Sequence, residues 1–303
     1  MFSPLQGQGT DARYRKYVGS CKREADMCEF CTQHGEGEKW YLNVRNYATE
    51  LLHDPGRLSM IRNFYRETVE KGNVTIGRME MLYQRNPKVL NRIKDAYARE
   101  MKAVHYGQVL PLEEVVQVLS LCNTAVRLPC GCRWAFDRKE KRVCFGISFG
   151  GTQWFNELDT DYFGEPDVGH IDDIDREKAV DIIKDLDRQG MVHSIWTFQT
   201  PFIGAICNCE LKSCLAMRAT VGIRMPLMFK AEGVALVEAE KCTGCRECMH
   251  MCQFNAIEFR EADNRSLIKE DRCFGCGVCR NACPENAIRL TDRTAHPLAS
   301  SLW

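Results

Sequence analysis

The chain has 303 residues, of which 45% are hydrophobic and 27% are charged, as in an ordinary globular protein. Its 41 Lys and Arg balance 41 Asp and Glu, so the charge does not favour binding to nucleic acid or to an anionic membrane. The unusual feature is the 18 cysteines, which occur mostly in C-x-C and C-x2-C groups. Such groups can bring several thiolates to one site, so they favour cytoplasmic metal binding over a secreted disulfide framework.

The N-terminal segment, residues 1–45, is expected to form an arm. Its first 20 residues have no apolar core and predict no secretory signal, and no later stretch has the length and apolarity of a membrane-spanning helix. Cys21, Cys28 and Cys31 are spaced C-x6-C-x2-C. Two interpretations stay open for them: they bind a cluster or zinc together with a fourth ligand, or they are free thiols.

Residues 46–230 predict a mainly helical domain with short β-hairpins. Apolar residues recurring at helical spacing predict helices over 46–71, 80–105, 111–123 and 175–190. Alternating apolar residues predict a strand at 191–198, a turn at Thr200-Pro201, and a second strand at 202–207.

Two cysteine groups interrupt this domain, each a C-x-C pair followed by a single cysteine. They comprise Cys130, Cys132, Cys144, Cys207, Cys209 and Cys214. An extended backbone, with Gly131 or Asn208 between the two thiols, would direct both thiols of a pair into one site. The six are candidate ligands of a further [4Fe–4S] cluster or, alternatively, of zinc, and a third interpretation is reduced structural cysteines without metal. Four ligands suffice for a cluster, so the sequence does not say which of the six would be needed.

Residues 231–293 contain an internal repeat. The spacing C-x2-C-x2-C-x3-C that begins at Cys242 recurs 31 residues later (273 − 242) at Cys273. Each half is expected to form a strand, a cysteine loop, a short helical turn and a second strand, in a pseudo-symmetric α+β module that depends on its metal. Gly244 and Gly275 are expected to supply the unusual backbone angles of the cysteine loops.

The spacing also predicts how the cysteines are shared. Three cysteines at two-residue intervals can reach three corners of one cubane, whereas the fourth points to the other cluster. The predicted ligands are Cys242, Cys245, Cys248 and Cys283 for [4Fe–4S] cluster I, and Cys273, Cys276, Cys279 and Cys252 for cluster II. This segment resembles the bacterial two-cluster ferredoxin family, which implies clusters close enough for rapid electron transfer. It departs from that family at Gln253, where a proline is usual.

The upstream region resembles that of a family of longer ferredoxin-domain proteins. The matching segments are C-x-C-R at 130–133, the single Cys144, G-M-V-H at 190–193 and I-C-N-C at 206–209. This resemblance implies an architecture rather than a reaction, and the chain departs from it in having only Cys214 after the second pair. His193 is interpreted either as a cap of helix carbonyls or as a hydrogen-bond partner of a cluster sulfur.

The expected fold class is therefore α+β, with the helical cysteine-rich domain, the ferredoxin-like module and a tail at 294–303. The expected function is iron–sulfur electron transfer, as a non-catalytic wiring subunit of a cytoplasmic oxidoreductase complex in anaerobic metabolism, with other subunits or a flavoprotein as partners. No nucleotide-binding pattern is present. The alternative is a redox enzyme whose upstream cysteine site is a catalytic metal centre. A nucleic-acid-binding regulator is disfavoured because the helix over 176–189 is acidic.

Overall fold

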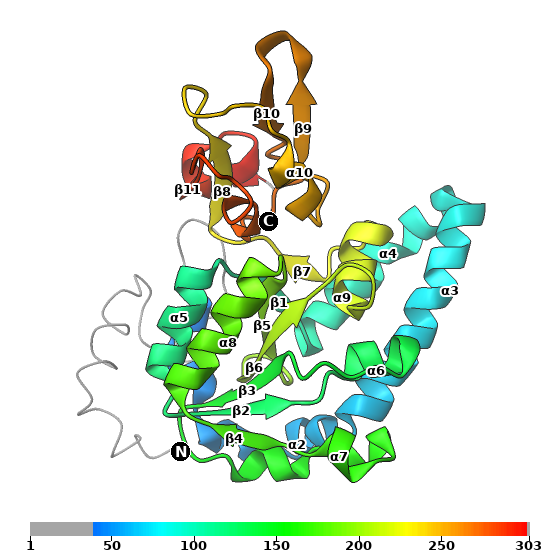
Figure 1. The fold of residues 1–303 in the computed structure, drawn as a ribbon. Coiled ribbons are helices and arrows are strands. Elements are labelled where there is room, and N and C mark those ends of the chain that lie inside the picture. Colours follow the sequence, from blue (N-terminus) through cyan, green and yellow to red (C-terminus); the bar gives the residue numbers. More distant parts are fainter. Residues whose placement is uncertain (1–38, 302–303) are drawn as a thin grey trace, which may run out of the picture.

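The computed structural model describes residues 39–301, so Cys21, Cys28 and Cys31 lie outside the described residues. A larger unit is built around a seven-stranded sheet, and a small C-terminal module contains two two-stranded sheets (Figure 1). This arrangement confirms the α+β class, while the predicted domain bounds stay predictions.

The N-terminal helical layer contains more and shorter helices than expected. Its elements are η1 (Trp40–Leu42), η2 (Val44–Tyr47), η3 (Thr49–His53), α2 (Pro55–Arg62), η4 (Phe64–Glu70), α3 (Lys71–Arg85) and α4 (Pro87–Val104). The helices expected over 46–71 and 80–105 are both interrupted before a proline, because proline lacks an N–H and disfavours helix in the preceding residue. Asp54 and Asn86 then cap the helices that begin at Pro55 and Pro87.

The large sheet has the order β4-β2-β3-β6-β5-β1-β7. Its strands are β1 (Gly107–Val109), β2 (Thr124–Leu128), β3 (Cys144–Ser148), β4 (Asp172–Ile174), β5 (Val192–Thr197), β6 (Ile203–Cys209) and β7 (Met228–Phe229). All neighbours are antiparallel except β1 and β7, which are parallel. The hairpin expected around Thr200-Pro201 is β5–β6. This hairpin does not stand alone as expected, because it is part of the seven-stranded sheet.

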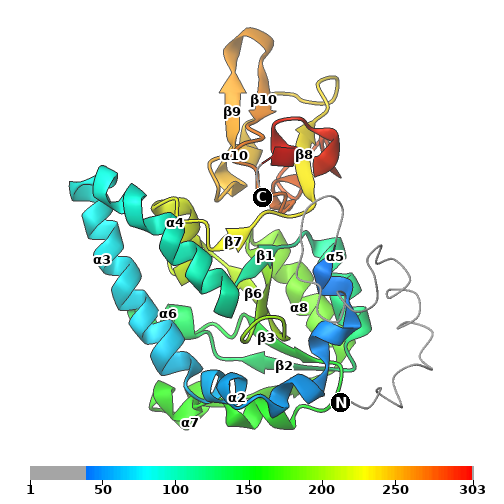
Figure 2. The same ribbon diagram turned by 180° about the vertical axis from the view of Figure 1, so that it is seen from behind.

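Helices cover both faces of this sheet, as the two opposite views show (Figures 1 and 2). One face packs against α5 (Leu112–Leu121) and α8 (Arg176–Arg188), with Val118, Ile183, Ile195 and Ile206 buried between them. The other face packs against α2 and η4, with Tyr65, Trp196 and Ala205 buried there. The remaining elements of this unit are α6 (Gly131–Asp137), η5 (Gln153–Glu157), η6 (Thr160–Phe163), α7 (Pro166–Gly169), α9 (Leu215–Met217) and η7 (Arg218–Gly222).

The C-terminal module has the predicted pseudo-symmetry. Its elements are β8 (Gly233–Val237), α10 (Glu247–Met251), β9 (Ile257–Arg260), η8 (Glu261–Asp263), β10 (Arg265–Ile268), η9 (Val278–Arg280), β11 (Ile288–Asp292), η10 (Arg293–Ala295) and η11 (Ala299–Ser301). The opening strand of each half pairs with the closing strand of the other, β8 with β11 and β10 with β9. Gly244 and Gly275 have φ values of +74° and +71°, which only glycine adopts readily.

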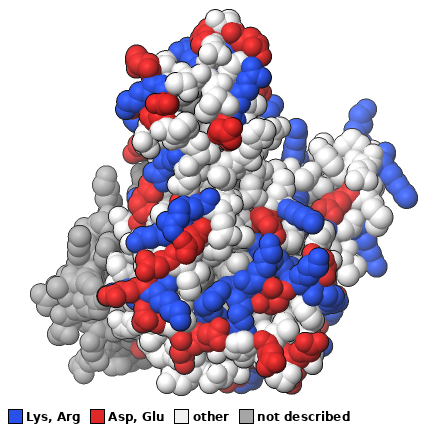
Figure 3. Space-filling view, viewed as in Figure 1, with Lys and Arg blue, Asp and Glu red and all other residues white. Residues whose placement is uncertain are grey.

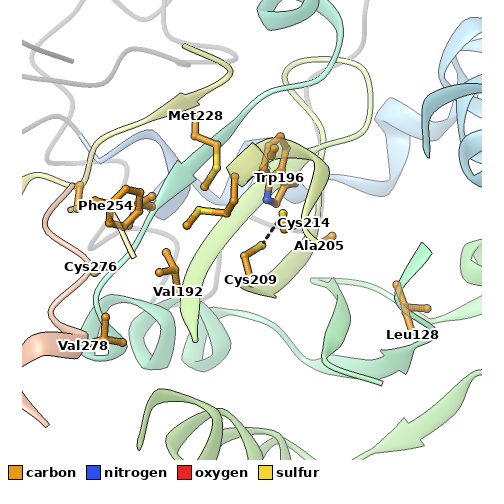
Figure 4. Packing of buried hydrophobic residues seen from close by; sticks show 14 of the residues in the cluster. Leu128, Val192, Trp196, Ala205, Cys209, Cys214, Met228, Phe254, Cys276 and Val278 are labelled. Atoms are coloured by element: carbon orange, nitrogen blue, oxygen red, sulfur yellow. Dashed lines mark hydrogen bonds between the residues drawn. The ribbon is translucent and has the colours of Figure 1, made fainter. Parts of the chain in front are cut away.

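The module docks beside the C-terminal end of α8. Asn281 donates from Nδ2 to the carbonyl and carboxylate of Asp187, at 3.0 and 2.8 Å. Gly190 has a φ of +82° and lies against Met251 so closely that a Cβ would stand 2.4 Å from its sulfur. The buried contacts are continuous between the two units, because one cluster contains Cys209 and Cys214 together with Phe254, Cys276 and Val278 (Figure 4).

The surface shows no region of a single charge sign in the view of Figure 1, where basic and acidic side chains are interspersed (Figure 3). Among the described residues, no helix is long and apolar enough to cross a membrane.

Candidate iron–sulfur sites

The C-terminal module contains two small cavities, each lined by four cysteines. Cys242, Cys245, Cys248 and Cys283 line a cavity of about 10 Å³. Cys252, Cys273, Cys276 and Cys279 line a second cavity of about 20 Å³. In each cavity the fourth cysteine comes from the other half of the repeat. The structure thus brings together the two sets of four that the spacing groups, while their binding of clusters stays a prediction.

Hydrogen-bond donors point at several of these sulfurs. The backbone N–H groups of Ala256 and Ala287 lie 3.4 and 3.2 Å from Cys252 Sγ and Cys283 Sγ, at equivalent positions of the repeat. Such donors stabilise the thiolate, which is the form that binds iron. At the first cavity, the Ser266 hydroxyl lies 3.4 Å from Cys248 Sγ. Burial raises the pKa of Cys248, and the hydrogen bond from Ser266 acts in the opposite direction.

Residues 235–290 match the family model of the 4Fe-4S dicluster domain. The C-terminal module is a 4Fe-4S dicluster domain. Its presence supports an iron–sulfur electron-transfer role for the chain. No curated protein matches the chain in the comparison with such proteins.

The six upstream cysteines come from four segments that meet outside the dicluster domain. Cys130 is the N-cap of α6 and Cys132 lies in its first turn, Cys144 begins β3, and Cys214 precedes α9. Cys207 and Cys209 lie on one face of β6, because alternate residues of a strand share a face. The extended C-x-C geometry therefore holds for this pair but not for Cys130 and Cys132, which are at a helix N-terminus.

Neighbouring strands and helices then bring the sulfurs together. Phe145 of β3 is paired with Ile206 of β6, and this register places Cys144 beside Cys207. Thiol–thiol interactions link the six into one series, with an Sγ–Sγ distance of 3.2 Å between Cys209 and Cys214. The order of the series is Cys130, Cys144, Cys207, Cys209, Cys214, Cys132.

All six cysteines line one cavity of about 120 Å³. The cavity extends from the sulfurs toward η4, α3 and α4, where its wall is largely apolar and aromatic, with Tyr65, Tyr97, Met101, Trp196 and Phe198 among its residues. Within residues 39–301, no three His, Cys, Asp or Glu side chains are grouped around the position of a single metal ion. A polynuclear cluster distributes its ligands over several metal atoms, so its thiolates need not converge on one point.

A buried arginine lies beside the sulfurs. The Arg133 guanidinium is 3% exposed, and it donates to Cys130 Sγ at 3.4 Å and to Glu210 Oε1 at 3.1 Å. Burial alone would lower the pKa of Arg133, but the Cys130 and Cys144 thiols and Glu210 outweigh it and raise that pKa. A thiolate buried in an apolar cavity would need positive charge nearby, and Arg133 places a permanent positive charge beside Cys130.

His193 occupies a different place from either sequence interpretation. It is fully buried, and its Nδ1 lies 2.5 Å from the Asn208 side-chain oxygen, while Nε2 lies 3.3 Å from Asp187 Oδ1, out of line for a hydrogen bond. Asn208 stands between Cys207 and Cys209, and Asp187 is bound by Asn281 of the dicluster domain. His193 therefore lies between the Asn208 side chain of the C-x-C segment and Asp187 at the docking contact of the dicluster domain.

Gln253 also connects the dicluster domain to the upstream cysteine site. In the sequence it stands out only because proline is usual at this position. Its Nε2 donates to the Gly190 carbonyl at 2.6 Å and lies 3.4 Å from the Cys209 carbonyl oxygen. Its Oε1 accepts from Leu211 N at 2.6 Å. Only its position directly after Cys252 could have drawn attention to this role.

Ser266 should raise the reduction potential of cluster I, because its hydroxyl favours the more negative, reduced cluster. Ser266→Ala should lower that potential by about 20–60 mV, since a hydrogen bond contributes about 0.5–1.5 kcal/mol and 59 mV corresponds to a tenfold change for one electron. The measurement is a redox titration followed by electron paramagnetic resonance (EPR). Cluster II is the internal control, and an equal shift of both potentials would contradict a local effect.

His105, at the wall of the large cavity, should reduce stability in acid. Burial lowers its pKa to about 4, partly offset by its hydrogen bond to the Thr197 carbonyl. The unfolded chain therefore takes up the proton first, and stability falls as the pH drops from about 6.5 toward 4, by about 1.4 kcal/mol at pH 5.5. His105→Asn keeps a donor and removes the titration, so its midpoint of urea unfolding should fall less than the wild type's between pH 7.5 and 5.5. Equal falls would argue against this assignment.

Proposed function

We propose that the chain is an electron-transfer protein in which the dicluster domain exchanges electrons with a further iron–sulfur cluster bound by the upstream cysteines. The observation that carries the proposal is that all six upstream cysteines, from four separate segments, line one cavity. Buried thiols without a metal gain nothing from being adjacent, since neighbouring sulfurs and burial oppose ionisation of most of them. A metal cluster would explain why the six cysteines lie together, because it binds thiolates directly.

The contact between the two units supports electron transfer between them. Gln253 is one peptide bond from Cys252, a predicted ligand of cluster II, and its side chain reaches the backbone at Cys209 and Leu211. Electron transfer weakens steeply with distance across empty space and less steeply through bonds and packed atoms. Cys209, Phe254 and Cys276 belong to one group of buried hydrophobic residues, so the contact between the two units is filled with packed atoms (Figure 4).

The surface charge bears on whether the protein is a mobile electron carrier or a fixed subunit. Freely diffusing ferredoxins use a strongly acidic surface to steer encounters, whereas acidic and basic groups are interspersed here (Figure 3). This distribution supports a fixed wiring subunit of a larger cytoplasmic oxidoreductase complex, with a flavoprotein or another redox subunit as the partner. Nucleic acid is not among the proposed partners.

A second function, that of a redox enzyme acting at the upstream site, is favoured by the size of its cavity. The cavity measures about 120 Å³, against about 10 and 20 Å³ for the cavities of the dicluster domain. Space beyond a cluster, walled by Tyr97, Trp196 and Phe198, would suit a small apolar substrate. In that case the dicluster domain supplies electrons to the reaction.

The test of the proposal is metal analysis of anaerobically purified protein, combined with a redox titration. The dicluster domain alone accounts for about eight irons, so an upstream [4Fe–4S] cluster predicts about twelve or more, with matching sulfide and a third redox transition. About eight irons without zinc would sink the proposal. About eight irons with one zinc would replace it with a structural or catalytic zinc site.

Gln253→Ala should slow electron transfer between the dicluster domain and the upstream cluster, because it removes the hydrogen bonds to Gly190 and Leu211. We expect the rate of electron transfer to fall about tenfold if these hydrogen bonds stabilise the docked arrangement of the two units by about 1.4 kcal/mol. The measurement is the rate of appearance of the reduced upstream cluster by rapid-freeze EPR after a pulse of reductant.

The matched control is Gln189→Ala, at an exposed glutamine that ends α8 nearby. This variant should keep the wild-type rate. An unchanged rate in Gln253→Ala, with all clusters present, would show that Gln253 only holds the two units in register.

A further inference from the structure

We propose that all six upstream cysteines bind one polynuclear iron–sulfur cluster, larger than a single cubane, rather than four of them binding one cubane. This inference rests on the proposed function, because it specifies the cluster that the upstream site holds. A single [4Fe–4S] cluster takes four protein ligands. Two of the six cysteines would then have to stand apart from the other four.

None of the six stands apart. The thiol–thiol interactions form an unbroken series in which the two sulfurs of the first C-x-C pair, Cys130 and Cys132, are the two ends. The middle of the series is the second pair, Cys207 and Cys209, on one face of β6. Leaving out any two members would place two buried thiols directly beside the ligands of the remaining four, since every member contacts another in the series.

The series divides evenly at its middle into two sets of three. One set is Cys130, Cys144 and Cys207, and the other is Cys132, Cys214 and Cys209. Each set thus contains one thiol from each C-x-C pair and one single cysteine. Three thiolates are also what one cysteine loop of the dicluster domain supplies to a cubane, whose fourth position is filled from elsewhere. Two such sets would therefore hold a cluster of about twice the size of one cubane.

The volume of the cavity agrees with a larger cluster. On the same scale, the two four-cysteine cavities of the dicluster domain measure about 10 and 20 Å³, whereas the six-cysteine cavity measures about 120 Å³. The six-cysteine cavity is therefore the largest of the three, and it extends beyond the sulfurs toward Tyr97 and Met101.

The cysteine that the site leaves out is informative. Cys122 is a seventh cysteine of the larger unit, 3% exposed, and it lies in the buried cluster on the α5 side of the sheet. Burial raises its pKa to about 12, and no other thiol contributes to that shift. A buried cysteine of this fold can therefore remain a simple apolar side chain, which makes the gathering of the other six a separate feature.

Formation of the cluster is balanced in protons, since each of the six thiols releases one as its sulfur binds iron. The iron and the sulfide come from outside the chain, and a mixture of ferrous and ferric iron gives the mixed-valence state of the cluster without a further oxidant. Arg133 donates to Cys130 and offsets part of the negative charge that six thiolates bring into the cavity.

The first experiment counts iron and acid-labile sulfide in the full-length protein, reconstituted anaerobically with ferrous iron, ferric iron and sulfide. Six-thiolate binding of a cluster with about twice the iron of one cubane predicts about sixteen irons per chain, a single upstream cubane about twelve, and the dicluster domain alone about eight. A count of about twelve would overturn this inference and leave the proposed function standing. A count of about eight would overturn both.

The second experiment replaces each of the six cysteines with alanine, one at a time, with Cys122→Ala as the matched control. All six variants should lose or change the same upstream EPR and Mössbauer spectrum, and Cys122→Ala should keep it. Two silent variants among the six would identify bystanders and overturn the inference. The dicluster spectrum reports folding in every variant, and where it is lost, the milder Cys→Ser substitution at that position takes the place of the alanine variant.

Discussion

The pairing of β3 with β6 is the contact on which the upstream site depends. It sets Cys144 beside Cys207, and the extended backbone of β6 turns Cys207 and Cys209 to one face while Ile206 turns to the other. A shift of one residue in this register would exchange the two faces and place both thiols among the helices α5 and α8. The other three cysteines then arrive from α6 and from the segment before α9, whose positions are set by packing on the same face.

The opposite face of the same two strands holds the polar contacts that connect the site to the dicluster domain. Asn208 points away from the sulfurs, contacts His193, and donates to the Val143 carbonyl at 2.5 Å. Burial would raise the pKa of Asp187, but His193 and Asn281 outweigh it and hold that pKa below its usual value. A charged carboxylate is therefore kept between the two units. Strand β6 thus presents sulfurs to a cavity on one face, and on the other face Asn208 contacts His193, which lies beside Asp187 at the contact with the dicluster domain.

The sequence was most informative where chemistry imposes a spacing. The repeat at Cys242 and Cys273 predicted the module, the two strands of each half and the glycines of its loops, because three thiolates around one cubane allow few backbone paths. The helices at α5 and α8 followed from apolar periodicity in the same way. The large sheet was not predicted, since strands such as β1, β4 and β7 have only two or three residues and show no period. Their pairing is decided by contacts between residues far apart in the chain.

The grouping of the six upstream cysteines could be predicted only in part from the sequence. Each C-x-C pair predicted two thiols in one site, but the helical start at Cys130 and the meeting of four segments depend on tertiary packing. Gln253 shows the same limit. As a residue in a ferredoxin motif it is only a missing proline, whose ring could neither donate to Gly190 nor accept from Leu211. In the folded chain the Gln253 amide makes both contacts. Glutamine in place of the usual proline therefore attaches the dicluster domain to the backbone beside the upstream cysteines.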